Sequence, residues 1–221
     1  MKLSAALTLI LSLTIFTGAQ SATDVDLKNL RKANGDTLSS PELPKIKIKF
    51  DKAFKYAGGH SFILYNVARA EQHFFVDADK KGNVSRFYWV QFEGYLPSNT
   101  HAYDYNSPKK VNIGGLDFFA DASARKVIPG EGRPDSDGNK AREFLASKGF
   151  RIASYEVMMQ RLVSMVTPDN RTELMIIYLE VLTPFGFLAA DLNEGGKAYE
   201  KWPAIADGLL ERAQKGMKIE R

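Results

Sequence analysis

Runs rich in β-branched and aromatic residues dominate the chain between residues 44 and 182. Such residues favour strands because their side chains fit the pleated surface of a sheet. Turn-forming stretches at 77–83 and 167–171 separate consecutive runs, which is typical of antiparallel hairpins. The strands predicted in this way are 45–50, 61–68, 71–78, 84–93, 111–119, 152–166 and 173–182.

The run 152–166 also fits a helix, because Ile152, Met159 and Val166 belong to an apolar stripe with helical spacing. We interpret it as a strand. A turn follows it directly, and the strand predicted at 173–182 needs a partner, which is usually the neighbour in sequence.

Two segments have helical periodicity. The first, 137–148, begins with Asp137 in a capping position and ends at Gly149. The second covers 196–216, and Pro203 is expected to kink or restart it. The apolar side of this second helix consists of Trp202, Ile205, Leu209 and Ala213.

These elements predict an α+β protein. We expect a curved antiparallel sheet of about 6–7 strands packed on a long C-terminal helix, plus one shorter helix. No internal repeat and no break divides residues 44–221, so they are interpreted as a single α+β domain.

The N-terminal residues have the pattern of a secretory signal peptide, which we assign to 1–21. Lys2 precedes an apolar run at 5–16, and small residues allow cleavage after residue 19 or 21. The polar stretch 22–43 is expected to be a flexible leader. The sequence therefore predicts a secreted or periplasmic protein with no integral membrane segment after cleavage.

Composition narrows the chemistry. The chain has no cysteine, which excludes a lipid-anchored cysteine, disulfides and thiol catalysis. The net charge of +4 is spread along the chain, and Lys45, Lys47 and Lys49 alternate with apolar residues as one polar face of a strand. We therefore expect no nucleic-acid partner.

The three histidines are His60, His73 and His101, and their spacing matches no metal motif. No phosphate-binding or dinucleotide-binding motif is present either. We therefore expect no metal and no cofactor. His60 follows two glycines at the start of a predicted strand, which makes it the best candidate of the three for a direct role.

The strand 84–93 has an unusual pattern. Phe87, Trp89, Gln91 and Glu93 share one face, while the other face is also partly apolar, which predicts a central strand. Polar groups in such surroundings must be hydrogen-bonded or face a water-filled pocket. The alternative to a pocket is a buried salt-bridge network, for example Arg161 with Glu93 or Glu180.

The main functional hypothesis is a binding domain for a small hydrophobic or aromatic molecule. Its pocket is expected between the curved sheet and the C-terminal helix. The candidate ligand-binding residues are Trp89, Gln91, Glu93, Tyr155, Arg161 and Tyr178, and Tyr65, Phe87 and Met159 complete the expected lining.

Two alternatives remain. One is an enzyme of lyase, isomerase or hydrolase type in the same pocket, with Glu93 or His60 as general base. The other is a protein-interaction domain of the cell envelope that docks a partner through its sheet and the tyrosine-rich loop 94–108. Rings in that loop could form a lid, a recognition surface or a simple cover for the core.

Overall fold

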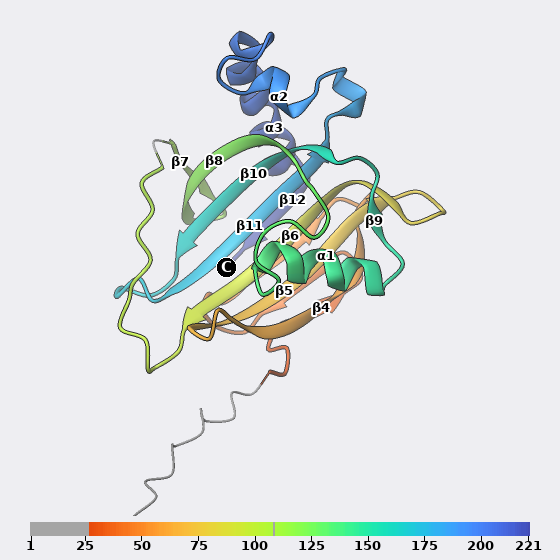
Figure 1. Ribbon diagram of the computed structural model, residues 1–221. Helices are drawn as coiled ribbons and strands as arrows, with labels where there is room; N and C mark the ends of the chain where they lie inside the picture. The colour runs from red at the N-terminus through yellow and green to blue at the C-terminus, as the bar shows by residue number, and fades with distance from the viewer. Residues whose placement is uncertain (1–26, 108) are drawn as a thin grey trace, which may run out of the picture.

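The computed structural model describes residues 27–107 and 109–221 (Figure 1). The expected signal peptide and residues 22–26 of the expected leader lie outside this range, so export stays a prediction. The described chain is mostly antiparallel sheet with three α-helices, which confirms the α+β class. Among the described helices, none combines the length and the apolar character needed to cross a membrane.

The large sheet is twisted and curved, and its strand order is β4-β5-β6-β11-β10-β8-β7 (Figure 1). All neighbours on this path are antiparallel, and the short strand β9 (Arg151–Ile152) pairs with β6 in parallel. The strands are β4 (Lys55–Leu64), β5 (Ala68–Ala78), β6 (Asn83–Tyr95), β7 (Lys109–Ile113), β8 (Leu116–Lys126), β10 (Glu156–Met165) and β11 (Thr172–Val181).

A second sheet, which the sequence interpretation missed, has the order β1-β2-β3-β12. Its strands are β1 (Lys32–Asn34), β2 (Thr37–Ser40), β3 (Ile46–Phe50) and β12 (Met217–Glu220). The expectation of a flexible leader is therefore wrong for residues 27–43. Leu38 and Ser40 are buried, and Gly35 has the positive φ of 59° that a tight hairpin turn requires.

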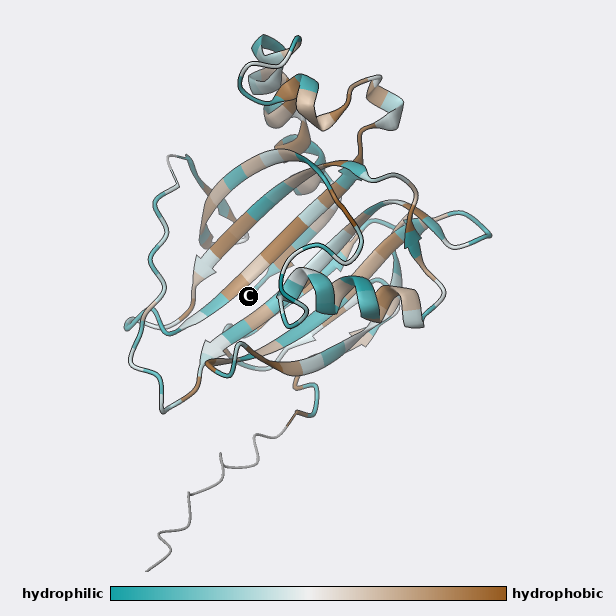
Figure 2. Ribbon diagram, viewed as in Figure 1, coloured by the Kyte–Doolittle hydropathy of each residue, from teal (hydrophilic) through white to brown (hydrophobic). Residues whose placement is uncertain are grey.

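The two faces of the large sheet have different covers (Figures 1 and 2). The small sheet and α3 (Trp202–Lys215) pack on one face. Helix α1 (Asp137–Ser147) packs on the other, and its outward surface is largely hydrophilic. Because side chains alternate along a strand, each central strand supplies residues to both cores. A short helix, α2 (Ala189–Leu192), precedes α3.

Most element predictions are close to the structure. Residues 152–166 do contain a strand, β10, and α1 begins at Asp137 as expected. The runs 61–68 and 111–119 are wrong as single strands. The chain turns at 65–67 between β4 and β5, and the glycine pair at 114–115 turns it between β7 and β8. The C-terminal helix is shorter than expected, because α3 begins at Trp202. Pro203 lies in its first turn, so of the two expected effects of this proline the structure has the restart and not the kink.

Candidate functional site: a cavity under helix α1

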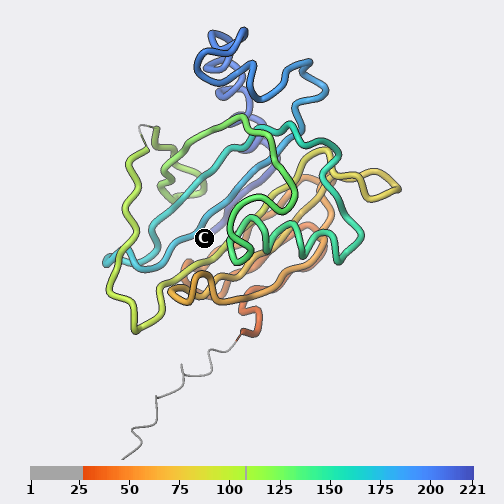
Figure 3. The backbone as a smooth tube through the Cα atoms, viewed as in Figure 1, coloured from red at the N-terminus to blue at the C-terminus, as the bar shows by residue number. Residues whose placement is uncertain are grey.

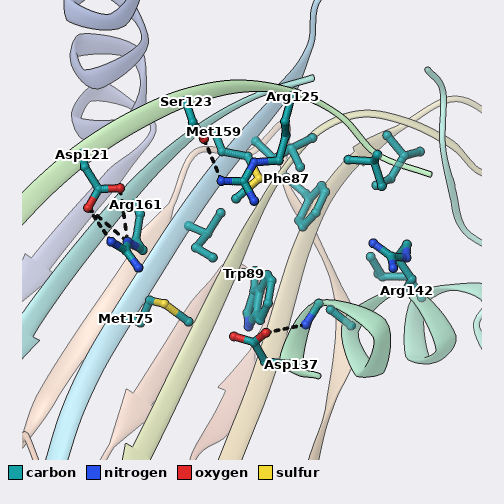
Figure 4. Close-up of a pocket in the computed structure, with 17 residues that line it drawn as sticks. Phe87, Trp89, Asp121, Ser123, Arg125, Asp137, Arg142, Met159, Arg161 and Met175 are labelled. Atoms are coloured by element: carbon teal, nitrogen blue, oxygen red, sulfur yellow. Dashed lines mark hydrogen bonds and ion pairs between the residues drawn. The ribbon is translucent and has the colours of Figure 1, made fainter. Parts of the chain in front are cut away.

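A cavity of about 390 Å³ lies between α1 and the large sheet (Figure 4). Strands β6, β11, β10 and β8 form its floor, and α1 forms one wall. No residue of α3 lines it, so this cavity lies on the opposite face of the sheet from the pocket expected beneath the C-terminal helix. The lining residues are Phe87, Trp89, Asp121, Ser123, Arg125, Val127, Asp137, Gly138, Ala141, Arg142, Leu145, Ile152, Met159, Arg161, Met175, Ile177 and Leu179.

The floor of the cavity is apolar and follows from strand register. Trp89 on β6 lies opposite Ile177 on β11, and Met159 on β10 lies opposite Leu179 on β11. All four side chains point to the α1 side of the sheet. The floor thus combines an indole ring, branched aliphatic groups and thioether side chains, a mixture that suits the body of a small apolar molecule.

Helix α1 is fixed over the sheet at its N-terminus. The Ser136 side chain accepts a hydrogen bond from the backbone N–H of Asn139, which caps the helix. The backbone carbonyl of Asp137 accepts a hydrogen bond of 3.1 Å from Gln72 Nε2 of β5. Ala141 and Leu145, four residues apart, then face the cavity.

Charged groups surround the apolar floor. Arg161 and Asp121 lie opposite each other on β10 and β8 and form an ion pair of 2.8 Å. The alternative of Arg161 with Glu93 or Glu180 is therefore wrong, and Glu180 instead pairs with Arg212 of α3 at 2.9 Å. The ion pair between Arg161 and Asp121 follows from the register of β10 and β8, which the sequence pattern does not specify.

Two further arginines line the cavity without a carboxylate partner among the described residues. Arg125 of β8 donates to Ser123 Oγ at 3.0 Å, and Arg142 of α1 donates to Asn139 Oδ1. Figure 4 shows Arg125 beside Phe87 and Met159, and Arg142 on α1 across the cavity from Arg125. Burial raises the pKa of the remaining charged group, Asp137, above its usual range.

A smaller hollow of about 260 Å³ adjoins the cavity and shares four lining residues with it. The shared residues are Val127, Arg142, Leu145 and Ile152. Tyr155 lines only the smaller hollow, where its side chain is 57 % exposed. Arg142 therefore stands where the two hollows meet.

A row of hydrogen-bonded polar side chains crosses the sheet beside the cavity. His60 on β4, Gln72 on β5 and Gln91 on β6 are cross-strand neighbours. His60 Nε2 contacts Gln72 Oε1 at 2.8 Å, and Gln72 Nε2 donates to Gln91 Oε1 at 2.7 Å. Gln91 Nε2 then donates to Glu93 Oε2 at 2.5 Å, and Trp89 Nε1 donates to Gln91 Oε1 at 3.1 Å.

The row ends at a pair of buried carboxyl groups. Glu93 lies opposite Glu173 of β11, and each accepts a hydrogen bond from a tyrosine of the loop 96–107. Tyr103 donates to Glu93 at 2.8 Å, and Tyr105 donates to Glu173 at 2.7 Å. Burial raises the pKa of Glu93, and burial together with the charge of Glu93 raises the pKa of Glu173 to about 8.

The loop that carries these tyrosines is fastened to the β10–β11 turn, beside which it passes in Figure 3. Arg171 donates to the backbone carbonyls of Leu96, Asn99 and His101. The backbone N–H of Tyr103 donates to the carbonyl of Asn170 at 2.8 Å. Of the roles considered for this loop, a cover for buried groups fits these contacts best.

The opposite face of β5 holds a separate buried cluster around Glu71, which is fully buried. Its carboxylate accepts backbone hydrogen bonds from Leu30 at 3.0 Å and Arg31 at 2.8 Å, and it contacts His73 Nε2 at 2.9 Å. Burial alone would raise the pKa of Glu71, but the donors from His73 and these backbone groups lower it to about 2. The cluster attaches the N-terminal segment to the large sheet.

The structure separates the candidate residues into groups. Trp89 and Arg161 line the cavity with Phe87 and Met159, while Tyr155 lines the adjoining hollow. Gln91 and Glu93 lie beside the cavity in the polar row, and His60 occupies its far end, stacked on Phe144 of α1 at 4.5 Å.

Two candidates lie elsewhere. Tyr178 points to the other face of the sheet, where its ring packs against Tyr88 at 4.8 Å and its hydroxyl donates to Glu180. Tyr65 lies in a turn with Arg133 4.0 Å above its ring. Tyr178 therefore cannot line the cavity, because Ile177 and Leu179 occupy that face of β11.

Sequence reasoning missed Asp121, Arg125, Asp137 and Arg142 as cavity residues. Asp137 and Arg142 belong to the helix predicted at 137–148, but nothing in the sequence shows which face of the sheet that helix covers. Within residues 27–107 and 109–221, no group of histidine and carboxylate side chains is arranged to hold a metal ion. Comparisons with protein-family models, curated proteins and solved structures found no match.

Proposed function

We propose that this chain is an exported binding protein that holds a small molecule with an apolar or aromatic body in the cavity under α1. The observation that carries the proposal is the combination of an apolar floor around Trp89 with a few polar groups at its edge. The volume of about 390 Å³ is within the range of small-molecule sites.

The floor suggests how such a molecule is held. A ring or aliphatic chain would pack against the indole of Trp89 and the ring of Phe87, which lie two residues apart on β6. Met159 and Met175 complete this surface with flexible side chains that adapt to different shapes. The floor is therefore expected to accept apolar bodies of different shapes.

Binding fits the geometry better than catalysis by Glu93 or His60. Both oxygens of Glu93 already accept hydrogen bonds, one from Tyr103 and one from Gln91. His60 Nε2 is engaged by Gln72. Neither Glu93 nor His60 lines the cavity, so a general base in either position would lack direct access to a bound molecule.

The test uses the neutral fluorescent probe N-phenyl-1-naphthylamine, whose emission rises in apolar surroundings. Ala141→Phe fills the cavity from α1, and Ser123→Phe fills it from β8. Each should weaken probe binding about tenfold or more, because the ring occupies the space of the ligand. Ala204→Phe is the matched control, since Ala204 is exposed on α3 and far from the lining.

Circular dichroism and thermal unfolding establish that each variant is folded. Two routes of filling are used because Ala141 is buried and its replacement can disturb helix packing. Unchanged probe binding in folded Ser123→Phe and Ala141→Phe proteins would refute the proposal. So would an equal loss of binding in Ala204→Phe.

A further inference from the structure

We propose that the molecule bound under α1 is an amphipathic anion, whose carboxylate or phosphate group is held by Arg125 and Arg142 while its apolar body covers the floor around Trp89. This inference rests on the proposed function. It specifies the chemical class of the ligand, which the apolar floor alone leaves open.

The lining of the cavity has more positive than negative groups. Three arginines and two aspartates face the cavity. Arg161 and Asp121 neutralise each other through an ion pair in which two guanidinium nitrogens contact the carboxylate. Burial disfavours the ionised form of the other aspartate, Asp137, and raises its pKa. Two arginines, Arg125 and Arg142, then stand against this one aspartate, so the lining has an excess of positive charge even when Asp137 is ionised.

Arg125 and Arg142 donate to no charged acceptor among the described residues. A guanidinium has five N–H donors, and the described contacts of Arg125 and Arg142 use only neutral acceptors, Ser123 Oγ and Asn139 Oδ1. No carboxylate among the described residues forms an ion pair with either side chain. Planar donor groups in this state match an oxyanion, whose oxygens accept paired hydrogen bonds.

Arg125 belongs to β8 and Arg142 to α1, so the two charges come from the sheet and from the helix that covers it (Figure 4). Arg142 also lines the smaller hollow. An anionic group near Arg142 would thus lie at the junction of the two hollows, with the larger one open to the apolar body.

Carboxylate and phosphate share the chemistry that the arginines recognise, so both are tested. Dodecanoate, dodecyl phosphate and dodecanol carry the same chain with different head groups. Each is used below its micellar concentration to displace N-phenyl-1-naphthylamine from the full chain. We expect at least one of the two anions to bind about tenfold more tightly than the alcohol, and the tighter one identifies the preferred head group.

The arginines are tested with the double variant Arg125→Gln/Arg142→Gln. It should weaken binding of the preferred anion about tenfold and leave dodecanol binding within about a factor of two. The control Arg133→Gln/Arg221→Gln removes the same charge from positions that line neither hollow. It should leave the preference for the anion intact, because a distant charge in water is largely screened.

Failure of the anionic-ligand inference and failure of the proposed function give different results in these experiments. If the probe and dodecanol bind but neither anion is preferred, the inference of an anionic ligand is refuted while the proposed function stands. It is equally refuted if the control variant loses the preference as strongly as the Arg125→Gln/Arg142→Gln protein. If neither the probe nor any of the three compounds binds the wild-type chain, the proposed function fails together with the inference.

Discussion

Glu93 and Glu173 lie directly opposite each other on β6 and β11, so two buried carboxyl groups share one cross-strand position. Two negative charges at such a position repel each other. Burial, together with this repulsion, raises the pKa of Glu173 to about 8, so this group is mostly protonated at pH 7. Tyr105 donates to one oxygen of Glu173, which keeps the loop in place over the pair.

The first prediction concerns Glu173→Gln. The folded protein binds this proton up to about pH 8, whereas the unfolded chain releases it near its ordinary pKa of 4.5. The wild-type free energy of unfolding therefore falls as pH rises from about 4.5 to about 8. The variant has no titrating group at this position, so its free energy of unfolding does not show this contribution to the fall. At pH 8 the variant should be more stable by about 1 to 3 kcal/mol.

Urea unfolding of both proteins between pH 5 and pH 8.5 measures the difference. Glu200→Gln is the control, because Glu200 is exposed in the turn before α3. If the free energies of unfolding of the wild type and Glu173→Gln change in parallel over the whole pH range, the prediction is wrong.

The second prediction concerns Glu71→Gln. In contrast to Glu173, the ionised Glu71 stabilises the folded protein, so its contribution to stability rises with pH. Because the folded pKa of Glu71 is about 2, its carboxylate stabilises the protein above pH 4.5, and this contribution is lost as pH falls towards 2. The amide cannot accept all the hydrogen bonds that the carboxylate receives. We expect a loss of about 2 to 4 kcal/mol at neutral pH.

The same variant should loosen the N-terminal segment. Hydrogen exchange measured by mass spectrometry should rise in residues 27–43 more than in α1, since Glu71 holds the backbone of Leu30 and Arg31. Glu131→Gln, on the exposed segment before α1, is the control. Uniform exchange in both variants would show that Glu71 does not attach this segment.

The third prediction separates the two faces of the sheet. Trp89→Leu should weaken binding of N-phenyl-1-naphthylamine about tenfold, because the variant loses the largest ring of the cavity floor. Tyr178→Phe should leave probe binding unchanged and lower stability by about 1 kcal/mol, the value of its hydrogen bond to Glu180. Probe titration measures the affinity of both variants for N-phenyl-1-naphthylamine, and urea unfolding measures their stability.

The alternation of 84–93 was sufficient to predict a central strand with Trp89, Gln91 and Glu93 on one face. Alternation within one strand is independent of register. The choice of Tyr178 as a lining residue failed because it required a comparison between two strands. Which residues of one strand share a face with those of another depends on strand pairing, and the sequence pattern does not specify that pairing.

The position of the cavity could not be predicted either. The sequence predicted both helices, but which face of the sheet each helix covers depends on long-range connections. The hairpin of β1 and β2 was missed although Gly35 and Asp36, which form its turn, are a typical two-residue hairpin sequence. Its strands are short and mostly polar, and they gain their stability from packing on a sheet that lies later in the chain.

The polar row also fixes the tautomer of His60. The amide nitrogen of Gln72 is directed to Gln91, so the oxygen of Gln72 faces His60 and can only accept. Burial lowers the pKa of His60, which favours the neutral ring with its proton on Nε2. The donors that link His60 to Glu93 then point the same way, from the imidazole towards the carboxyl group, and the row is a directed chain of dipoles with its positive end at Glu93.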